Sequence, residues 1–326
     1  MDRHGAVRLP ALLELHSTVL FFMAEGVMAE GVTPFAITPF AIVAGCGPAG
    51  RRCAVDCGYP LFKEPAMITE HEIPILEYDD SSPEVIAPDH DWTAGALPEK
   101  CLFAFLGNVV HEHAAAHGAQ VVHTFVTVTF DIPVYVLRIG GEEGEDICLV
   151  QSPIGAPAAA QLLDTLVSCG CRKVIAVGSC GVLADIEENA FIVPTRALRA
   201  EGTSYHYLPA ARYVELDEEP IAVIEETLRQ HGLPFVTCVT TWTTDGFFRE
   251  TRDMVRYRLD EGCSVVEMEC AALAACCKLR RARFGQLLFT ADSLANVHEY
   301  DARDFGADSH EKALLLGLDV LRNWPA

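Results

Sequence analysis

The stretch Ser264–Leu273, which reads Ser-Val-Val-Glu-Met-Glu-Cys-Ala-Ala-Leu, places two carboxylates and a thioether at the end of an apolar run. The β-branched residues at its start predict a buried strand, and the alanine- and leucine-rich sequence from Cys270 to Leu279 predicts a helix. Glu267, Met268 and Glu269 therefore stand at the junction of a strand and a helix.

Two interpretations of these glutamates follow from the residues alone. A carboxylate at this junction can accept two hydrogen bonds from a vicinal diol, and the thioether of Met268 offers a soft apolar surface to a sugar ring. Alternatively, both glutamates cap the amino end of the helix, where the helix dipole favours negative charge. The triplet alone favours capping, so a sugar-binding role depends on its surroundings.

Two further apolar runs end in polar groups. A predicted strand from Lys173 to Val177 leads into Gly178-Ser179-Cys180-Gly181, a glycine-flanked turn whose amides and hydroxyl can approach an anion closely. Two glycines in such a turn also occur for steric reasons alone. A predicted strand from Arg283 to Thr290 delivers Asp292 to the same end of the fold as Ser179 and the junction glutamates.

Composition limits the class of protein. With 326 residues and 50% hydrophobic content, the chain can bury the core of one large α/β domain or two small ones. Its net charge of -22 argues against nucleic acid or an anionic membrane as a partner. The 13 cysteines include no Cys-x-x-Cys pair, so we expect reduced core thiols in a cytoplasmic protein.

The amino-terminal segment differs from the rest, and we interpret residues 1–65 as an extension of a catalytic domain over residues 66–326. Residues 24–43 contain short back-to-back duplications, and the apolar run before them is too short to cross a bilayer. The candidate ligands of a metal cluster in this segment are Cys46, Cys53, Asp56 and Cys57. Their spacing fits no familiar zinc pattern, so no metal is expected there.

From Ile68 onward, the pattern alternates between strands and helices and predicts an α/β domain. A first strand is expected at Ile73–Glu77, followed by a turn-rich loop, and a helix is expected at Leu102–His117. His113 and His117 lie one turn apart on that helix, which is a metal-like spacing. Because no carboxylate or cysteine motif completes a site, a solvated histidine set is favoured.

Four stretches in a fixed order carry a resemblance to a known family. They are Val177–Val182, Glu201–Tyr207, Val266–Ala272 and Thr290–Ser293. Val266–Ala272, read as Val-Glu-Met-Glu-Cys-Ala-Ala, resembles the sugar-binding signature of the nucleoside phosphorylase superfamily. The resemblance extends from about Ile68 to the carboxyl terminus. It implies a three-layer α/β/α sandwich with a mixed central sheet.

The resemblance also implies a nucleoside site made by residues of the matching motifs. They are Ser179, Gly181, Phe247, Glu267, Met268, Glu269, Asp292 and Arg303. Glu269 and Met268 would hold the ribose, and Ser179 would contact the sugar and phosphate. A glycosidic carbon–nitrogen bond breaks through a cation-like sugar, so a carboxylate on the diol and a nucleophile beneath the ring suit this chemistry.

At the base, the resemblance implies that Phe247 stacks on a flat heterocycle, although it could equally be a core phenylalanine. Asp292 would donate a proton to a purine ring nitrogen, a task that suits an acid with a raised pKa. Arg303 lies close downstream and could orient Asp292. Because the Glu201–Tyr207 loop also suits a uridine-acting branch, the choice between purine and pyrimidine stays open, as does the choice between ribose and a modified sugar.

Two departures from the family pattern concern the nucleophile. Phosphorylases usually carry Gly-Asp-Pro-x-Arg after the first strand, whereas Asp79–Val85 reads Asp-Asp-Ser-Ser-Pro-Glu-Val, and Ala176 stands where a second arginine is expected. Both losses remove bidentate phosphate donors. In the hydrolytic nucleosidases of the superfamily, a glutamate near the first position holds a water, and Glu84 fits that place.

The sequence therefore predicts a nucleoside phosphorylase that transfers the sugar to phosphate, with no metal or organic cofactor. A nucleosidase that uses water held by Glu84, and a non-catalytic nucleoside-binding protein, are the alternatives. The family builds active sites across subunit interfaces, so we expect a homo-oligomer, from a dimer to a hexamer.

Overall fold

The computed structural model describes residues 68–325 except for positions 90, 91, 94 and 142. The predicted extension over residues 1–65 lies outside the described residues, so its boundary stays a prediction. The candidate metal ligands in it, which also lie outside, are Cys46, Cys53, Asp56 and Cys57. None of the described helices combines the length and apolar character that a membrane span requires.

A ten-stranded mixed sheet forms the centre of the described part of the chain. Its strands are β1 (Lys100–Ala104), β2 (Gln120–Val126), β3 (Asp131–Ile139), β4 (Glu145–Gln151), β5 (Lys173–Val182), β6 (Phe191–Ala200), β7 (Tyr213–Glu215), β8 (Phe235–Thr244), β9 (Cys263–Glu267) and β10 (Arg283–Ser293). Strand β5 pairs in parallel with β1 and β10 and antiparallel with β9. Because β10, β6, β8 and β9 also pair in that order, they close into a ring with β5.

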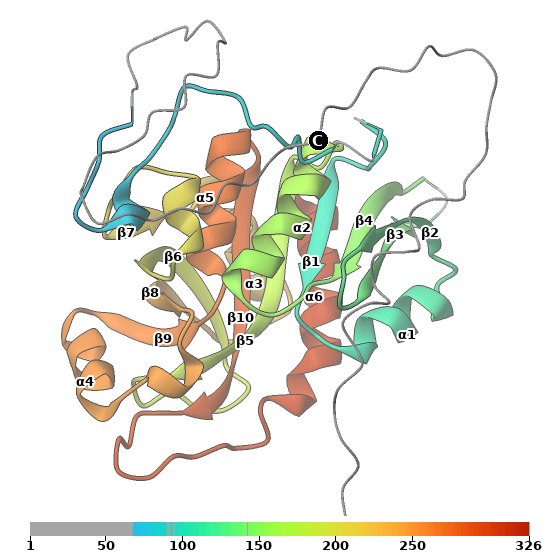
Figure 1. Cartoon of the computed structure of the whole chain (residues 1–326). Coiled ribbons are helices and arrows are strands. Elements are labelled where there is room, and N and C mark those ends of the chain that lie inside the picture. Colours follow the sequence, from blue (N-terminus) through green and yellow to red (C-terminus); the bar gives the residue numbers. More distant parts are fainter. Residues whose placement is uncertain (1–67, 90–91, 94, 142, 326) are drawn as a thin grey trace, which may run out of the picture. The chain divides into compact units, whose positions relative to one another are not determined.

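Helices cover both faces of the sheet (Figure 1). They are α1 (Asn108–Ala116), α2 (Ala156–Ser168), α3 (Glu218–Gln230), α4 (Arg252–Asp260), α5 (Cys270–Arg280) and α6 (His310–Asn323). Helices α2 and α5 pack together over one face, where Phe103 and Phe284 are buried, whereas α1, α3 and α6 cover the other face around Phe289 and Trp324. The predicted α/β/α sandwich is confirmed.

The start of the sandwich differs from the prediction in two elements. The expected strand Ile73–Glu77 is a short 3-10 helix at Pro74–Leu76, because proline lacks the N–H that a sheet ladder requires. The expected helix Leu102–His117 is strand β1 followed by α1, with Gly107 between them at a φ of 62°. Strand β1 is extended because β4 and β5 pair with it on both sides. The first strand therefore begins at Lys100.

The glycine-rich motif is also not the predicted turn. Strand β5 continues through Gly178–Gly181 as far as Val182, because its backbone pairs with β10 as far as Thr290 and then with β9. Within this stretch Ser179 is exposed while its neighbours are buried. Ser179 therefore reaches the ligand side from a rigid strand.

The junction between β9 and α5 assigns different tasks to its two glutamates. Glu267 Oε2 accepts hydrogen bonds from the backbone N–H groups of Glu269 and Cys270, at 2.7 and 2.6 Å, where α5 begins. Its Oε1 accepts from the hydroxyls of Thr241 and Thr243, at 3.1 and 2.6 Å. The capping interpretation therefore describes Glu267, and this network holds Glu269 in place.

We expect Thr243→Val to destabilise this junction by about 1–3 kcal/mol, because buried groups lose hydrogen bonds. The Thr243 hydroxyl donates to Glu267 and also accepts the N–H of Ala271 at 3.0 Å. Thr241→Val is the matched control, since Thr241 makes only the longer bond to the same oxygen, and its effect should be smaller. Urea unfolding with an unchanged m-value measures the difference, and equal midpoints for both variants would contradict this account.

Candidate active site

One cavity of about 460 Å³ opens where the carboxyl ends of β5 and β10 meet the end of β9. Seven of the nine predicted site residues line it. They are Ser179, Gly181, Phe247, Glu267, Met268, Glu269 and Asp292. Glu84 and Arg303 are the two that do not. Three of the four sequence motifs thus converge on a single cavity, although the first lies more than 80 residues from the other two in the chain.

Glu269 is the buried carboxylate best placed to accept sugar hydroxyls. Its side chain is 8% exposed, and its Oε1 accepts a hydrogen bond from the backbone N–H of Gly155 at 2.5 Å. Burial, followed by the negative charge of Glu267, raises the pKa of Glu269 to about 8. The free protein therefore holds this carboxyl largely protonated at neutral pH, and donors from a diol would favour its charged form.

The raised pKa of Glu269 makes stability depend on pH. Because the folded state keeps a proton that the unfolded state releases near pH 4.5, the free energy of unfolding should fall as pH rises from about 5 to 8. Glu269→Gln cannot release this proton, so its stability relative to the parent should grow by up to about 1.4 kcal/mol per pH unit across that window. Urea unfolding at several pH values tests this; parallel profiles would exclude it.

Asp292 is the second buried acid of the cavity. Its side chain is 8% exposed, and Tyr300 donates its hydroxyl to Oδ2 at 3.1 Å. Burial raises the pKa of Asp292, while the Tyr300 hydrogen bond and the positive charge of Arg303 oppose that rise. The Arg303 guanidinium donates instead to the carbonyl of Ile186 at 2.9 Å. Tyr300, rather than Arg303, is therefore the side chain that orients Asp292.

The glycine at position 181 leaves room for this acid. A Cβ built on Gly181 would lie 2.9 Å from Leu294 Cδ1, 3.1 Å from Val266 Cγ1 and 3.2 Å from Asp292 Oδ1. Any larger residue would therefore press on Asp292 and its neighbours. The sequence suggested that the glycines allow an anion to approach the backbone. In the structure, Gly181 also allows the Asp292 carboxyl group to lie close to it.

Phe247 and Glu250 belong to a turn that the sequence did not resolve. A 3-10 turn at Phe247–Arg249 comes before helix α4, which begins at Arg252. Phe247 is 45% exposed, so it is not a core phenylalanine, and it meets Phe248 edge to face. Glu250 lines the same cavity, where burial and the charge of Asp292 raise its pKa to about 7.

Several other lining residues escaped the sequence reasoning. Gln286 is 2% exposed in β10 and its Oε1 has no hydrogen-bond partner among the described residues, so a ligand donor could satisfy it. Its signal was a polar residue within an apolar strand. Gln151 and His310 come from β4 and α6, and Gly107 precedes α1. No local pattern pointed to these three.

The cavity is acidic. Among the described residues, four carboxylates and no lysine or arginine line it. Three arginines close in sequence to the motifs are engaged elsewhere. Arg196 donates to the Thr240 hydroxyl at 2.7 Å, Arg199 donates to two backbone carbonyls, and Arg212 pairs with Glu261. Among the described residues, only groups other than lysine and arginine could therefore hold a phosphate in this cavity.

Glu84 lies away from this cavity, which corrects its predicted position. It pairs with Arg280 at 2.9 Å, and Arg280 also binds Asp164 at 2.6 Å. These residues line a separate cavity of about 500 Å³, together with part of the Glu201–Tyr207 loop. The prediction failed because the loop that carries Glu84 comes before the first described strand, which begins at Lys100, and so does not follow it.

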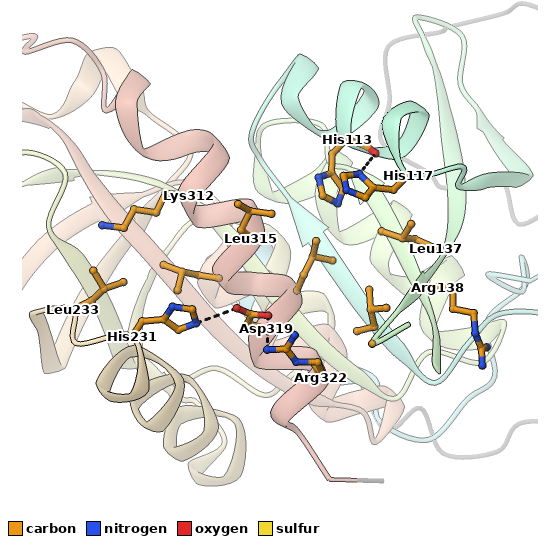
Figure 2. A pocket seen from close by; sticks show the side chains of 14 residues that line it. His113, His117, Leu137, Arg138, His231, Leu233, Lys312, Leu315, Asp319 and Arg322 are labelled. Atoms are coloured by element: carbon orange, nitrogen blue, oxygen red, sulfur yellow. Dashed lines mark hydrogen bonds and ion pairs between the residues drawn. The ribbon is translucent and has the colours of Figure 1, made fainter. Parts of the chain in front are cut away.

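A further cavity of about 520 Å³ lies on the side of α1, α3 and α6 (Figure 2). The rings of His113 and His117 stack at 4.0 Å there, while His231 pairs with Asp319 at 3.0 Å. Among the described residues, these histidines form no group of potential metal ligands. No predicted site residue lines this cavity, so it is not the candidate active site.

Comparisons with known proteins identify the family. The family model described as "Phosphorylase superfamily" matches residues 103–321. A guanosine phosphorylase from Halorubrum lacusprofundi is 27% identical over 176 residues, which cover 52% of this chain and 68% of that protein. A uridine phosphorylase from Treponema pallidum is 28% identical over 221 residues, covering 60% and 77%.

Solved structures share the fold. An AMP nucleosidase from Bacteroides thetaiotaomicron has a TM-score of 0.55 and 24% identity, covering 69% of this chain and 88% of that one. A uridine phosphorylase from Vibrio fischeri has a TM-score of 0.60 and 20% identity, covering 74% and 98%. Since the family match spans more than half of the sequence, this chain belongs to the phosphorylase superfamily, as the resemblance implied.

Proposed function

We propose that this chain is an enzyme that cleaves the N-glycosidic bond of a purine ribonucleoside. The observation that carries the proposal is the single cavity in which two buried acids, Glu269 and Asp292, lie with the exposed ring of Phe247. Superfamily relatives are named for purine nucleosides, guanosine and uridine, which supports a nucleoside as the substrate.

Each proposed role follows from a side chain's surroundings. Glu269 accepts the ribose hydroxyls, with the thioether of Met268 against the sugar, while Phe247 stacks on the base. Burial raises the pKa of Asp292, which favours its protonated form, and this acid gives a proton to the purine ring so that the base leaves uncharged. A second acid with a raised pKa, Glu250, lies at the base end and supports a purine, whose edge offers N–H groups to carboxylates.

Phosphate is the proposed nucleophile. The named curated relatives are phosphorylases, and the cavity offers the start of α1 at Gly107 and the hydroxyl of Ser179. A helix amino end presents free N–H groups and a partial positive charge to an anion. Since no described arginine or lysine lines the cavity, phosphorolysis would gain most from a cation of a second subunit, in line with the expected homo-oligomer.

Hydrolysis is the second candidate, and the acidic lining of the cavity favours it. Any of the four lining carboxyl groups that is ionised would repel a phosphate dianion, and no described lysine or arginine offsets that charge, whereas water carries no such penalty. The water would have to be held by groups other than Glu84, which pairs with Arg280 outside the cavity.

The products decide between these functions. The full chain is incubated with guanosine, inosine, adenosine and uridine, each with and without phosphate, and both the base and the sugar product are measured. Ribose 1-phosphate that forms only with phosphate would establish phosphorolysis, and free ribose at equal rates in both buffers would establish hydrolysis instead. Binding without base release from any nucleoside would overturn the enzymatic proposal and leave a nucleoside-binding protein.

A further inference from the structure

Three cysteines lie together at the opposite end of the strands from the active-site cavity. Cys101 is the second residue of β1, Cys148 is its direct partner in β4, and Cys171 lies two residues before β5. Their sulfur atoms all lie within 4.8 Å of one another, and each side chain is 0% exposed. Among the described residues, these three cysteines are the one group of His, Cys, Asp or Glu side chains whose ligand atoms lie close enough together to bind one metal ion.

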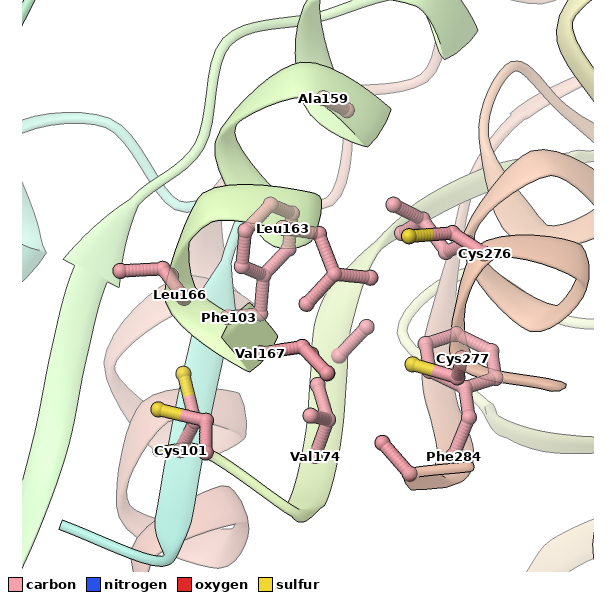
Figure 3. Packing of buried hydrophobic residues seen from close by; sticks show 14 of the residues in the cluster. Cys101, Phe103, Ala159, Leu163, Leu166, Val167, Val174, Cys276, Cys277 and Phe284 are labelled. Carbon is pink, nitrogen blue, oxygen red and sulfur yellow. The ribbon is translucent and has the colours of Figure 1, made fainter. Parts of the chain in front are cut away.

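The trio is separate from the other core cysteines. Figure 3 shows Cys101 on one side of Val167, whereas Cys276 and Cys277 of α5 lie on the other side of it. All are free thiols in one apolar cluster. Three thiols from three different backbone segments thus face a common point. Packing alone would be served as well by alanine or valine at these positions.

We propose that Cys101, Cys148 and Cys171 form a binding site for one thiophilic metal ion with a filled d shell, of the Cu(I) or Zn(II) type. Soft thiolate ligands select such ions over hard cations. With metal–sulfur bonds of about 2.3 Å, three ligands around one ion stand about 4.0 Å apart. The observed separations of at most 4.8 Å would need only a small inward movement of the side chains.

The surroundings can offset part of the charge of such a site. Binding one ion to three thiolates releases three protons, and it leaves two net negative charges with Cu(I) and one with Zn(II). Arg172 is the adjacent cation, and its guanidinium donates to the backbone carbonyl of Cys171 at 2.8 Å.

The number of available ligands distinguishes between Zn(II) and Cu(I). Structural zinc sites almost always have four protein ligands, and the described residues supply three. Complete burial also keeps a water from the fourth position. The geometry therefore favours Cu(I), which is stable with three soft ligands.

The test measures metal binding by the full-length chain, reduced and free of oxygen, in equilibrium dialysis against Cu(I) or Zn(II). Because the thiols are buried, dialysis continues until the metal content is constant. We expect one equivalent of Cu(I), a sulfur-to-metal charge-transfer band, and a higher Tm. Cys148→Ser and Cys171→Ser should each weaken binding at least about 10-fold. Cys277→Ser, a fully buried thiol outside the trio, is the matched control and should bind like the parent.

Each outcome decides the proposal. Equal binding by the parent and by both trio variants would place the metal elsewhere and overturn it, as would the absence of a bound equivalent of either metal. One equivalent of Zn(II) in place of Cu(I), lost in the trio variants, would retain the site and change the metal. Cys148→Ala and circular dichroism of every variant distinguish loss of ligands from loss of folding.

Discussion

Asp292→Asn is expected to lower kcat/KM for a purine ribonucleoside by about 10²- to 10⁴-fold, the usual contribution of a general acid. The asparagine keeps the shape of the side chain and can still accept the Tyr300 hydroxyl, but it has no acidic proton to give to the purine. Steady-state rates of base release measure the effect. The loss should appear in kcat, because the proton moves only as the bond breaks.

A substrate with an activated base separates proton donation from a structural effect. The purine of 7-methylguanosine already carries the positive charge that protonation would create, so its cleavage should change little in Asp292→Asn. The matched control is Asp308→Asn, which changes an exposed aspartate of the same carboxyl-terminal segment and should leave all rates unchanged. Equal losses for guanosine and 7-methylguanosine would show that Asp292 has no role as a proton donor.

Glu269→Gln is expected to reduce kcat/KM for ribonucleosides by about 10²- to 10³-fold, because a charged acceptor stabilises the cation-like sugar more than an amide does. Its pKa of about 8 adds a signature in pH. If the charged carboxylate binds the diol, kcat/KM of the parent should rise with pH up to about 8, since the free enzyme must first lose this proton. This rise of kcat/KM with pH should be absent from the Glu269→Gln variant.

Deoxynucleosides provide the control for the role of Glu269. A 2′-deoxyribonucleoside lacks one of the two hydroxyls, so the parent should prefer the ribonucleoside and the Glu269→Gln variant should have a much smaller preference. An unchanged ratio between the two sugars would mean that Glu269 does not contact the diol. Thr243→Val tests the neighbouring cap, so a loss of stability in that variant with the sugar preference intact would confirm that Glu267 supports the site without binding the sugar.

Much of the fold was predictable because it depends on local patterns. Beyond Lys173, the expected strands and helices occur in the predicted order, since buried strands and amphipathic helices each produce a characteristic spacing of apolar residues. The predictions failed where pairing with a neighbouring strand, and not the local sequence, determines the secondary structure. Leu102–His117 is compatible with a helix, yet β4 and β5 on either side draw its first part into the sheet. The same pairing extends β5 through its glycines.

The residues of the candidate site also fall into those that the sequence indicated and those that only the structure revealed. Ser179, Glu269 and Asp292 could be grouped from the sequence because each ends an apolar run of the same sheet. Glu250 and Gln286 could not, because their significance comes from burial beside residues far away in the chain. Glu84 was assigned to the wrong position because the prediction took Ile73–Glu77 as the first strand, whereas the first described strand begins at Lys100.

By itself, the sequence determined the family, the layered α/β architecture and most of the side chains that line the candidate cavity, because motifs and apolar spacing are local properties of the chain. Only the tertiary structure decided which of the two glutamates in the cavity also caps α5, and that no described lysine or arginine lines the cavity. It also brought Cys101, Cys148 and Cys171 together. These features depend on distances between segments that are far apart in sequence. Strand pairing and helix packing set those distances, and no single stretch of sequence encodes them.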